Sequence, residues 1–136
     1  MCINNTCYGY IQHKEDISLW KELVSYFSKN GTELRIDCWN DEKEIIGKLK
    51  YYANKVDIMS DMTIFSFNIS DELVKSLVSL NDTKINYFSL FIKSSDNDIF
   101  SAEHYGKEIY MVKMNEKDVE FVKSIIPANC DFTTEI

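Results

Sequence analysis

The chain has 136 residues and a mass of 15.9 kDa, which is close to the commonest size of one domain. Its 15 Lys and Arg against 22 Asp and Glu give a formal net charge of -7, and Arg35 is the only arginine. Because phosphate neutralisation needs Lys and Arg, and base readout relies mostly on Arg, this composition argues against nucleic-acid binding.

The sequence also argues against membrane attachment and metal chemistry. It has no apolar run near the roughly 20 residues that a spanning helix needs, and its first residues lack a signal-peptide pattern. We therefore expect a cytoplasmic protein. The four cysteines, at positions 2, 7, 38 and 130, have no C-x-x-C spacing, and His13 and His104 are the only histidines. This spacing predicts no disulfide framework, no metal site and no cofactor.

Strongly patterned segments alternate along the first part of the chain. Residues 6–12 predict a strand, and residues 17–29 predict a helix because apolar residues recur at helical spacing before the Asn30-Gly31 stop. Residues 33–39 alternate as in a strand with one buried face. Its two sides are Leu34, Ile36 and Cys38 on one face and Arg35, Asp37 and Trp39 on the other.

The middle of the chain predicts two more helices around a strand. Asp41 and Glu44 have the spacing of a capping box, and the helix that follows carries apolar residues from Ile45 as far as Val56. Residues 62–69 predict an apolar strand. Ser70 then caps a third helix, which ends near residues 81–82.

The last part of the chain is richer in strands. Residues 85–93 are apolar on both faces, with Tyr87 and Phe91 on one side, which predicts a central strand covered on both sides. Residues 94–98 predict a turn, and residues 99–104 and 108–114 predict two antiparallel strands joined by a tight turn. Asn115 caps a last helix that ends before Pro127, and we expect a frayed tail after it.

These elements predict an α+β fold: one domain, residues 1–136, in which helices pack against a mixed β-sheet in the order (β)αβαβαβββα. The alternating part favours some parallel strands, whereas the three consecutive strands favour antiparallel neighbours.

No sequence motif of a known catalytic site is present. The four glycines, at positions 9, 31, 47 and 106, cannot form either common phosphate-binding pattern. The best catalytic candidate is His104, which could act as a general base if a carboxylate oriented it. The adjacent Glu103 would point to the opposite face of a strand, so we expect His104 to lie on the surface without a catalytic role.

Two acidic segments are more typical of recognition. In the first, Trp39 lies among Asp37, Asp41 and Glu42, and an exposed Trp flanked by acids suits a basic partner. The alternative is that Trp39 belongs to the core. The second segment is the acidic edge of the predicted hairpin. Its residues are Asp96, Asp98, Glu103 and Glu108.

In size, acidity and lack of catalytic motifs, and in these two acidic segments, the chain resembles the small acidic bacterial immunity proteins that neutralise a cognate toxin. The resemblance implies an inhibitor that covers the active or substrate-binding surface of a basic toxin, such as a nuclease, by pairing carboxylates with the toxin's Lys and Arg. From the composition and the missing motifs we expect no nucleic-acid or membrane partner and no cofactor, and we expect a monomer or weak dimer.

Two other functions stay open on the sequence. One is a small enzyme that uses His104 with an acid supplied by folding, and the other is a ligand-sensing or scaffolding domain. A convergent pocket beside His104 would favour an enzyme, whereas a flat acidic face would favour the inhibitor.

Overall fold

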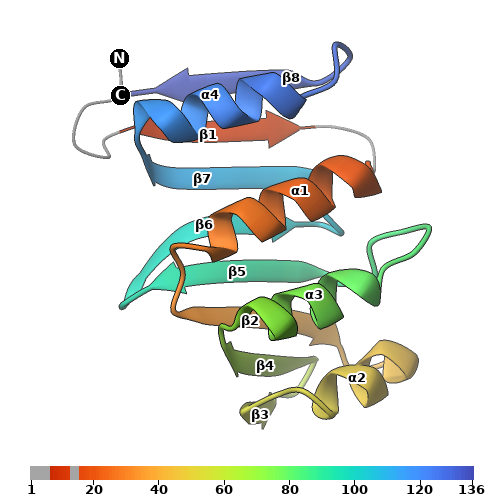
Figure 1. Cartoon of the computed structure of the whole chain (residues 1–136). Helices are drawn as coiled ribbons and strands as arrows, with labels where there is room; N and C mark the ends of the chain where they lie inside the picture. The colour runs from red at the N-terminus through yellow and green to blue at the C-terminus, as the bar shows by residue number, and fades with distance from the viewer. Residues whose placement is uncertain (1–6, 13–15) are drawn as a thin grey trace.

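The computed structural model describes residues 7–12 and 16–136, and within them four helices accompany one eight-stranded sheet (Figure 1). The expected α+β class is confirmed. Cys2 and His13 lie outside the described residues. The strands are β1 (Cys7–Gln12), β2 (Glu33–Trp39), β3 (Lys55–Ile58), β4 (Met62–Asn68), β5 (Ser89–Ser94), β6 (Asn97–Glu103), β7 (Glu108–Met114) and β8 (Asp131–Glu135). The helices are α1 (Ile17–Ser28), α2 (Lys43–Lys50), α3 (Asp71–Ser79) and α4 (Glu116–Ile125).

The sheet is purely antiparallel rather than mixed. Its strands follow the order β3-β4-β2-β5-β6-β7-β1-β8, and each described neighbouring pair is antiparallel. The expected helix–strand alternation does join strands that run in the same direction. Each such pair is separated by at least one other strand, as β2 and β3 are by β4, so the neighbours remain antiparallel.

The connections explain why the helices share one side of the sheet. α1 and α2 each follow a strand of one direction and connect it to a strand nearer the β3 edge. α3 and α4 each follow a strand of the opposite direction and connect it to a strand nearer the β8 edge. Because both the strand direction and the direction of the connection are reversed between these two groups, connections of the same handedness place all four helices on the same face of the sheet. Figure 1 shows the four helices on one side of the sheet.

The two faces of the sheet differ in chemistry. We call the face under the helices the covered face and the opposite one the open face. The covered face is apolar and closed from solvent, with Ile36, Phe65, Leu90, Phe100 and Ile109 each at most 1% exposed. The open face carries charged and aromatic side chains. They include Arg35, Asp37, Trp39, Phe91, Glu103, Glu108, Tyr10 and Tyr110.

Helix starts follow the expected caps in two of three cases. The side chain of Ser70 accepts the Leu73 N–H (3.2 Å), and Asn115 forms a capping box with Asp118. The expected capping box of Asp41 is wrong, because α2 begins at Lys43 after Glu42. The Glu42 carboxylate accepts the Trp39 N–H instead (2.8 Å), which ties the end of β2 to the start of α2.

Three strand expectations need correction. Val56, expected on a helix, lies in β3, and the expected frayed tail forms β8 against β1. β5 begins only at Ser89, so residues 85–88 are not in the strand. The Tyr87 hydroxyl donates to the Leu77 carbonyl of α3 (2.6 Å), whereas Phe91 lies half-buried on the open face. β5 is central, as expected, but helices cover only one of its sides.

The cysteines depart from the expectation in one position. Cys7 takes part in a disulfide, whereas Cys38 and Cys130 have free thiols. Burial on the covered face raises the pKa of the Cys38 thiol to about 12, so this thiol packs as a small apolar group, as expected. Among the described helices, none combines the length and apolarity needed to cross a bilayer.

Candidate functional site

Strand register brings three of the predicted recognition residues into one row on the open face. Asp37 of β2 lies opposite Ser89 of β5, Ser89 lies opposite Glu103 of β6, and Glu103 lies opposite Glu108 of β7. Directly opposite residues share a face of the sheet. Carboxylates that are far apart in the sequence therefore lie in one row across four neighbouring strands, with Ser89 between Asp37 and Glu103.

Glu103 and Glu108 form a like-charge pair across β6 and β7. Such pairs destabilise a sheet when the residues lie directly opposite each other. The Glu103 carboxylate accepts the Ser101 hydroxyl (3.0 Å), and the Glu108 carboxylate accepts the Tyr110 hydroxyl (3.0 Å). In the described residues neither carboxylate has a Lys or Arg within ion-pair distance. The pair is thus a local concentration of negative charge on the open face, with no Lys or Arg of the described residues beside it.

Asp37 differs from these two glutamates because it is already paired. Both of its oxygens accept hydrogen bonds from the Arg35 guanidinium, each at 2.8 Å, and Asp37 is only 6% exposed. The guanidinium also lies 5.0 Å from the ring centroid of Phe91, a cation–π distance. The hydrogen bond to Asp37 raises the pKa of Arg35. Asp37 is therefore a neutralised structural group rather than a free carboxylate.

Trp39 ends β2 at the rim of the open face. It is 38% exposed, so the core alternative for this residue is wrong. Its ring lies 4.8 Å from that of Phe88, and Phe88 makes an edge contact with His104 at 5.7 Å between centroids. Trp39 is thus held in place by a neighbouring ring while it keeps a solvent-facing surface.

His104 has an orienting acid that the local sequence did not reveal. Its Nδ1 atom lies 2.7 Å from a Glu108 carboxylate oxygen across the β6–β7 turn, whereas the adjacent Glu103 makes no such contact. His104, Tyr105 and Gly106 have φ angles of 54°, 58° and 79°, a left-handed run that costs energy for the two non-glycine residues. The turn thereby directs His104 to the open-face side.

The other end of this turn is fixed in the core. A Cβ atom at Gly106 would lie 2.5 Å from Cδ1 of Ile85 and 3.0 Å from Cδ1 of Trp20, so only glycine fits there. The Tyr105 hydroxyl donates to the Glu42 carboxylate (2.9 Å), and burial together with this bond raises the pKa of Tyr105 to about 12.

A tyrosine cluster continues the open face beyond Glu108, and the sequence analysis missed it. Tyr10 and Tyr110 lie opposite each other on β1 and β7 with ring centroids 4.8 Å apart. Tyr8, 53% exposed, lines the same shallow hollow of about 330 Å³. The hydrogen bond to Glu108 is the main cause that raises the pKa of Tyr110 to about 12. The alternating tyrosines of β1 were a sequence signal for this cluster, but the sequence did not show that β1 pairs with β7.

These contacts form one continuous network across the open face. It runs from Trp39 through Phe88, His104 and Glu108 to Tyr110. Its members come from β2, the residue before β5, the β6–β7 turn and β7. The arrangement offers carboxylate oxygens between two aromatic surfaces, which suits a cation with an apolar stem.

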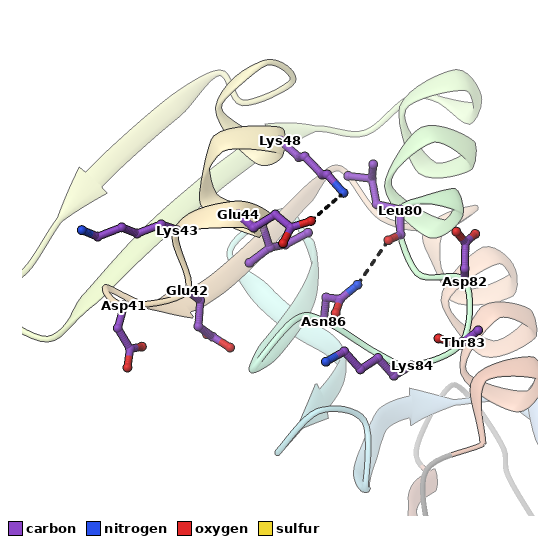
Figure 2. Close-up of a pocket in the computed structure, with 11 residues that line it drawn as sticks. Asp41, Glu42, Lys43, Glu44, Lys48, Leu80, Asp82, Thr83, Lys84 and Asn86 are labelled. Carbon is purple, nitrogen blue, oxygen red and sulfur yellow. Dashed lines mark hydrogen bonds and ion pairs between the residues drawn. The ribbon is translucent and has the colours of Figure 1, made fainter.

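The remaining predicted residues lie elsewhere. Asp41 and Glu42 line a hollow of about 540 Å³ between the start of α2 and residues 80–86, on the helix side (Figure 2). In this hollow Lys48 pairs with Glu44 (3.6 Å). Its charges are mixed, so it does not extend the acidic row. The lining charges are Asp41, Glu42, Glu44 and Asp82 against Lys43, Lys48 and Lys84.

Asp96 and Asp98 lie by the β5–β6 turn, at the opposite end of β6 from Glu103. Both are exposed, and the negative charge of Asp98 contributes to the raised pKa of Arg35. The predicted acidic edge is therefore divided. Glu103 and Glu108 belong to the network on the open face, whereas Asp96 and Asp98 do not.

Other chemistry has little support in residues 7–12 and 16–136. No three His, Cys, Asp or Glu side chains there are arranged to hold a metal ion. His104 lines neither of the two hollows described above, nor a third one that Tyr105 lines together with Glu42 and Lys107. The chain matches no known protein family, no curated protein and no solved structure.

Proposed function

We propose that the open face binds a protein, and that the partner presents a basic side chain to the Glu103–Glu108 pair. The observation that carries this proposal is the like-charge pair beside the half-exposed Trp39. Two carboxylates that face each other without a Lys or Arg reduce folding stability, and an incoming basic side chain would relieve their repulsion.

The proposed partner is a cognate basic toxin, and the mechanism is occlusion of its active or substrate-binding surface. The Glu103 and Glu108 carboxylates would pair with Lys or Arg that otherwise hold an anionic substrate. The net charge of -7 would speed the approach of a cationic protein. Trp39 and the exposed Tyr8 and Tyr110 would slow dissociation as aromatic anchors.

We place this inhibitor in the cytoplasm of the producing cell, where it would meet its toxin before export. The Cys7 disulfide is a feature more typical of oxidising compartments. Fractionation of the producing cells, with alkylation of free thiols at lysis, tests this placement. Recovery of the chain from an oxidising compartment contradicts it.

The binding proposal is tested with the product of the neighbouring gene as the candidate toxin. Co-expression of the chain should restore growth, and interferometry should give an association rate that falls as salt rises. The double variant Glu103→Lys with Glu108→Lys should weaken the complex about a hundredfold or more, since charge reversal against a buried cation costs several kcal/mol. Glu22→Lys, on the exposed side of α1, is the matched control and should change it little.

An affinity that is indifferent to both salt and these reversals contradicts the electrostatic mechanism. If the product of the neighbouring gene does not bind, it is not the partner. A basic protein captured by the chain would then be tested for binding with the same variants. Loss of binding by Glu22→Lys alone would move the site to the helix side.

A second candidate function rests on the His104–Glu108 contact at 2.7 Å. A carboxylate at Nδ1 leaves Nε2 of the imidazole as a general base, which is the arrangement of a catalytic dyad. The His104 side chain is 58% exposed, which favours the binding role over an enzyme that excludes water. Full growth protection by His104→Ala supports the inhibitor. Loss of a measured turnover with an intact fold supports the enzyme.

A further inference from the structure

The two edge strands of the sheet, β3 and β8, carry different side chains, and β3 is the apolar one. Eight large hydrophobic side chains remain exposed in the described residues, and four of them lie within residues 51–59. They are Tyr51 (85% exposed), Val56 (37%), Ile58 (71%) and Met59 (55%). An apolar patch at an unpaired sheet edge indicates an interaction site.

The backbone of β3 also has hydrogen-bonding groups directed to the edge. The Met59 N–H donates to the Met62 carbonyl of the adjacent strand at 2.8 Å. Hydrogen-bonded pairs alternate along an antiparallel ladder, so Asp57 and Lys55 also turn their backbone groups toward β4. Val56 and Ile58 therefore turn their N–H and C=O groups outward, and among the described strands β3 has no neighbour besides β4.

We infer that β3 pairs with β3 of a second copy of this chain, antiparallel, with the two-fold axis at Val56. The two Val56 residues would exchange N–H to C=O hydrogen bonds across the axis. This register places Lys55 of each copy opposite Asp57 of the other. Both side chains lie on the open face, where they form an ion pair at 3.6 Å within the strand. The strand is thus complementary in charge to itself.

On the covered face the same register brings apolar groups together. Val56 lies opposite Phe65 of β4, and Ile58 lies opposite the buried Thr63, so both side chains point to the helix side. In the dimer the two Val56 side chains would touch, with Ile58 of both copies on the same face. Burial of these side chains supplies the apolar part of the association free energy.

The other edge favours closure at two copies. A β8 strand paired with itself about Thr133 would place Asp131 opposite Glu135 of the second copy, a like-charge contact. Pairing of β3 with β8 would be heterologous and would lead to an open filament. The β3–β3 contact is isologous, and it leaves only the acidic β8 edges unpaired.

Sedimentation velocity on the full chain, from about 1 µM to about 500 µM, tests this dimer. We expect a concentration-dependent shift from monomer to dimer mass. Lys55→Glu and Asp57→Lys should each raise the dissociation constant about tenfold, because each places two like-charge pairs across the axis. The double variant Lys55→Glu with Asp57→Lys should restore it to within about threefold, since the swapped charges are again complementary.

Val56→Pro removes an outward N–H and leaves the ladder to β4 intact, so it should abolish the dimer. Asp131→Lys at the other edge is the control and should leave the dissociation constant unchanged. A monomer mass at every concentration overturns the inference, as does a dimer whose single variants are not rescued by the charge swap. Because none of these residues lies in the Trp39–Tyr110 network, these outcomes do not depend on the proposed toxin partner.

Discussion

The same eight strands present two faces that are built for different purposes. On the covered face, Phe100 and Ile36 are closed from solvent by helices, and their apolar side chains supply the free energy of folding. On the open face, Glu103 and Glu108 repel each other while Trp39 keeps a third of its surface in water. One face stabilises the fold, whereas the other carries a like-charge pair that lowers stability, and we propose that a partner relieves this repulsion.

Truncation of a phenylalanine on each face should show the largest contrast. Phe100→Ala removes a buried ring on β6 and should lower the free energy of unfolding by about 3–5 kcal/mol. Phe91→Ala, on the adjacent β5, removes a half-buried ring that stacks with Arg35, and about 1–2 kcal/mol should be lost. Urea unfolding followed by tryptophan fluorescence measures both. Equal losses would mean that the open face is packed like a core.

The next contrast separates Asp37, which is paired on the open face, from Glu22, an exposed glutamate of α1. Asp37→Ala should cost about 1–3 kcal/mol, since it removes two charged hydrogen bonds and leaves the half-buried Arg35 unpaired. Glu22→Ala on α1 should change stability by less than about 0.5 kcal/mol. A small loss for Asp37→Ala would instead return Asp37 to the set of residues available to a partner.

Alkaline pH should separate tyrosines on the two sides of the sheet. Burial is the main cause that raises the pKa of Tyr26 to about 12, whereas the Glu108 hydrogen bond is the main cause for Tyr110. Because the pKa of each tyrosine is higher in the folded state than the ordinary value of 10.0, its contribution to the free energy of unfolding is complete below pH 10 and is lost as the pH rises toward 12. Absorbance of the phenolates should show that Glu108→Gln lowers the pKa of Tyr110 and leaves that of Tyr26 near 12. An unchanged Tyr110 titration would exclude Glu108 as its cause.

The covered face was largely predictable from the sequence, and the open face was not. Alternation in residues 33–39 and the caps at Ser70 and Asn115 are local signals, and local interactions decide them in the structure. β3 was missed because Tyr52, Ala53 and Val56 continue the apolar spacing of α2. Tertiary pairing with β4 overrides that weak helical preference.

The site was only partly predictable for a related reason. Its acids were identified one by one. Glu103 and Glu108 lie on the consecutive strands β6 and β7, but the position of Asp37 in the same row depends on strand order, because β2 lies far from them in the chain. The pairing of Asp37 with Arg35, two residues away on the same strand face, was open to local reasoning. The contact of His104 with Glu108 depends on the left-handed turn between β6 and β7, and no sequence motif predicts that turn.

The smallest expected effect has the opposite sign and tests the meaning of the open face most directly. Glu103→Gln keeps an acceptor for the Ser101 hydroxyl but removes one charge of the like-charge pair with Glu108. It should therefore raise the free energy of unfolding by about 0.2–1 kcal/mol at low salt. The gain should shrink in about 1 M salt, where the Debye length falls to about 3 Å.

Glu22→Gln, which relieves no such pair, should give no gain in chemical unfolding under either condition. If the open face is kept acidic for a partner, Glu103→Gln should also weaken the complex with that partner, so that stability and binding move in opposite directions. A variant that is less stable than the parent would show that the Glu103 carboxylate is a structural group like Asp37. The Glu103–Glu108 pair would then not lower folding stability, and its role in recognition would lose its main support.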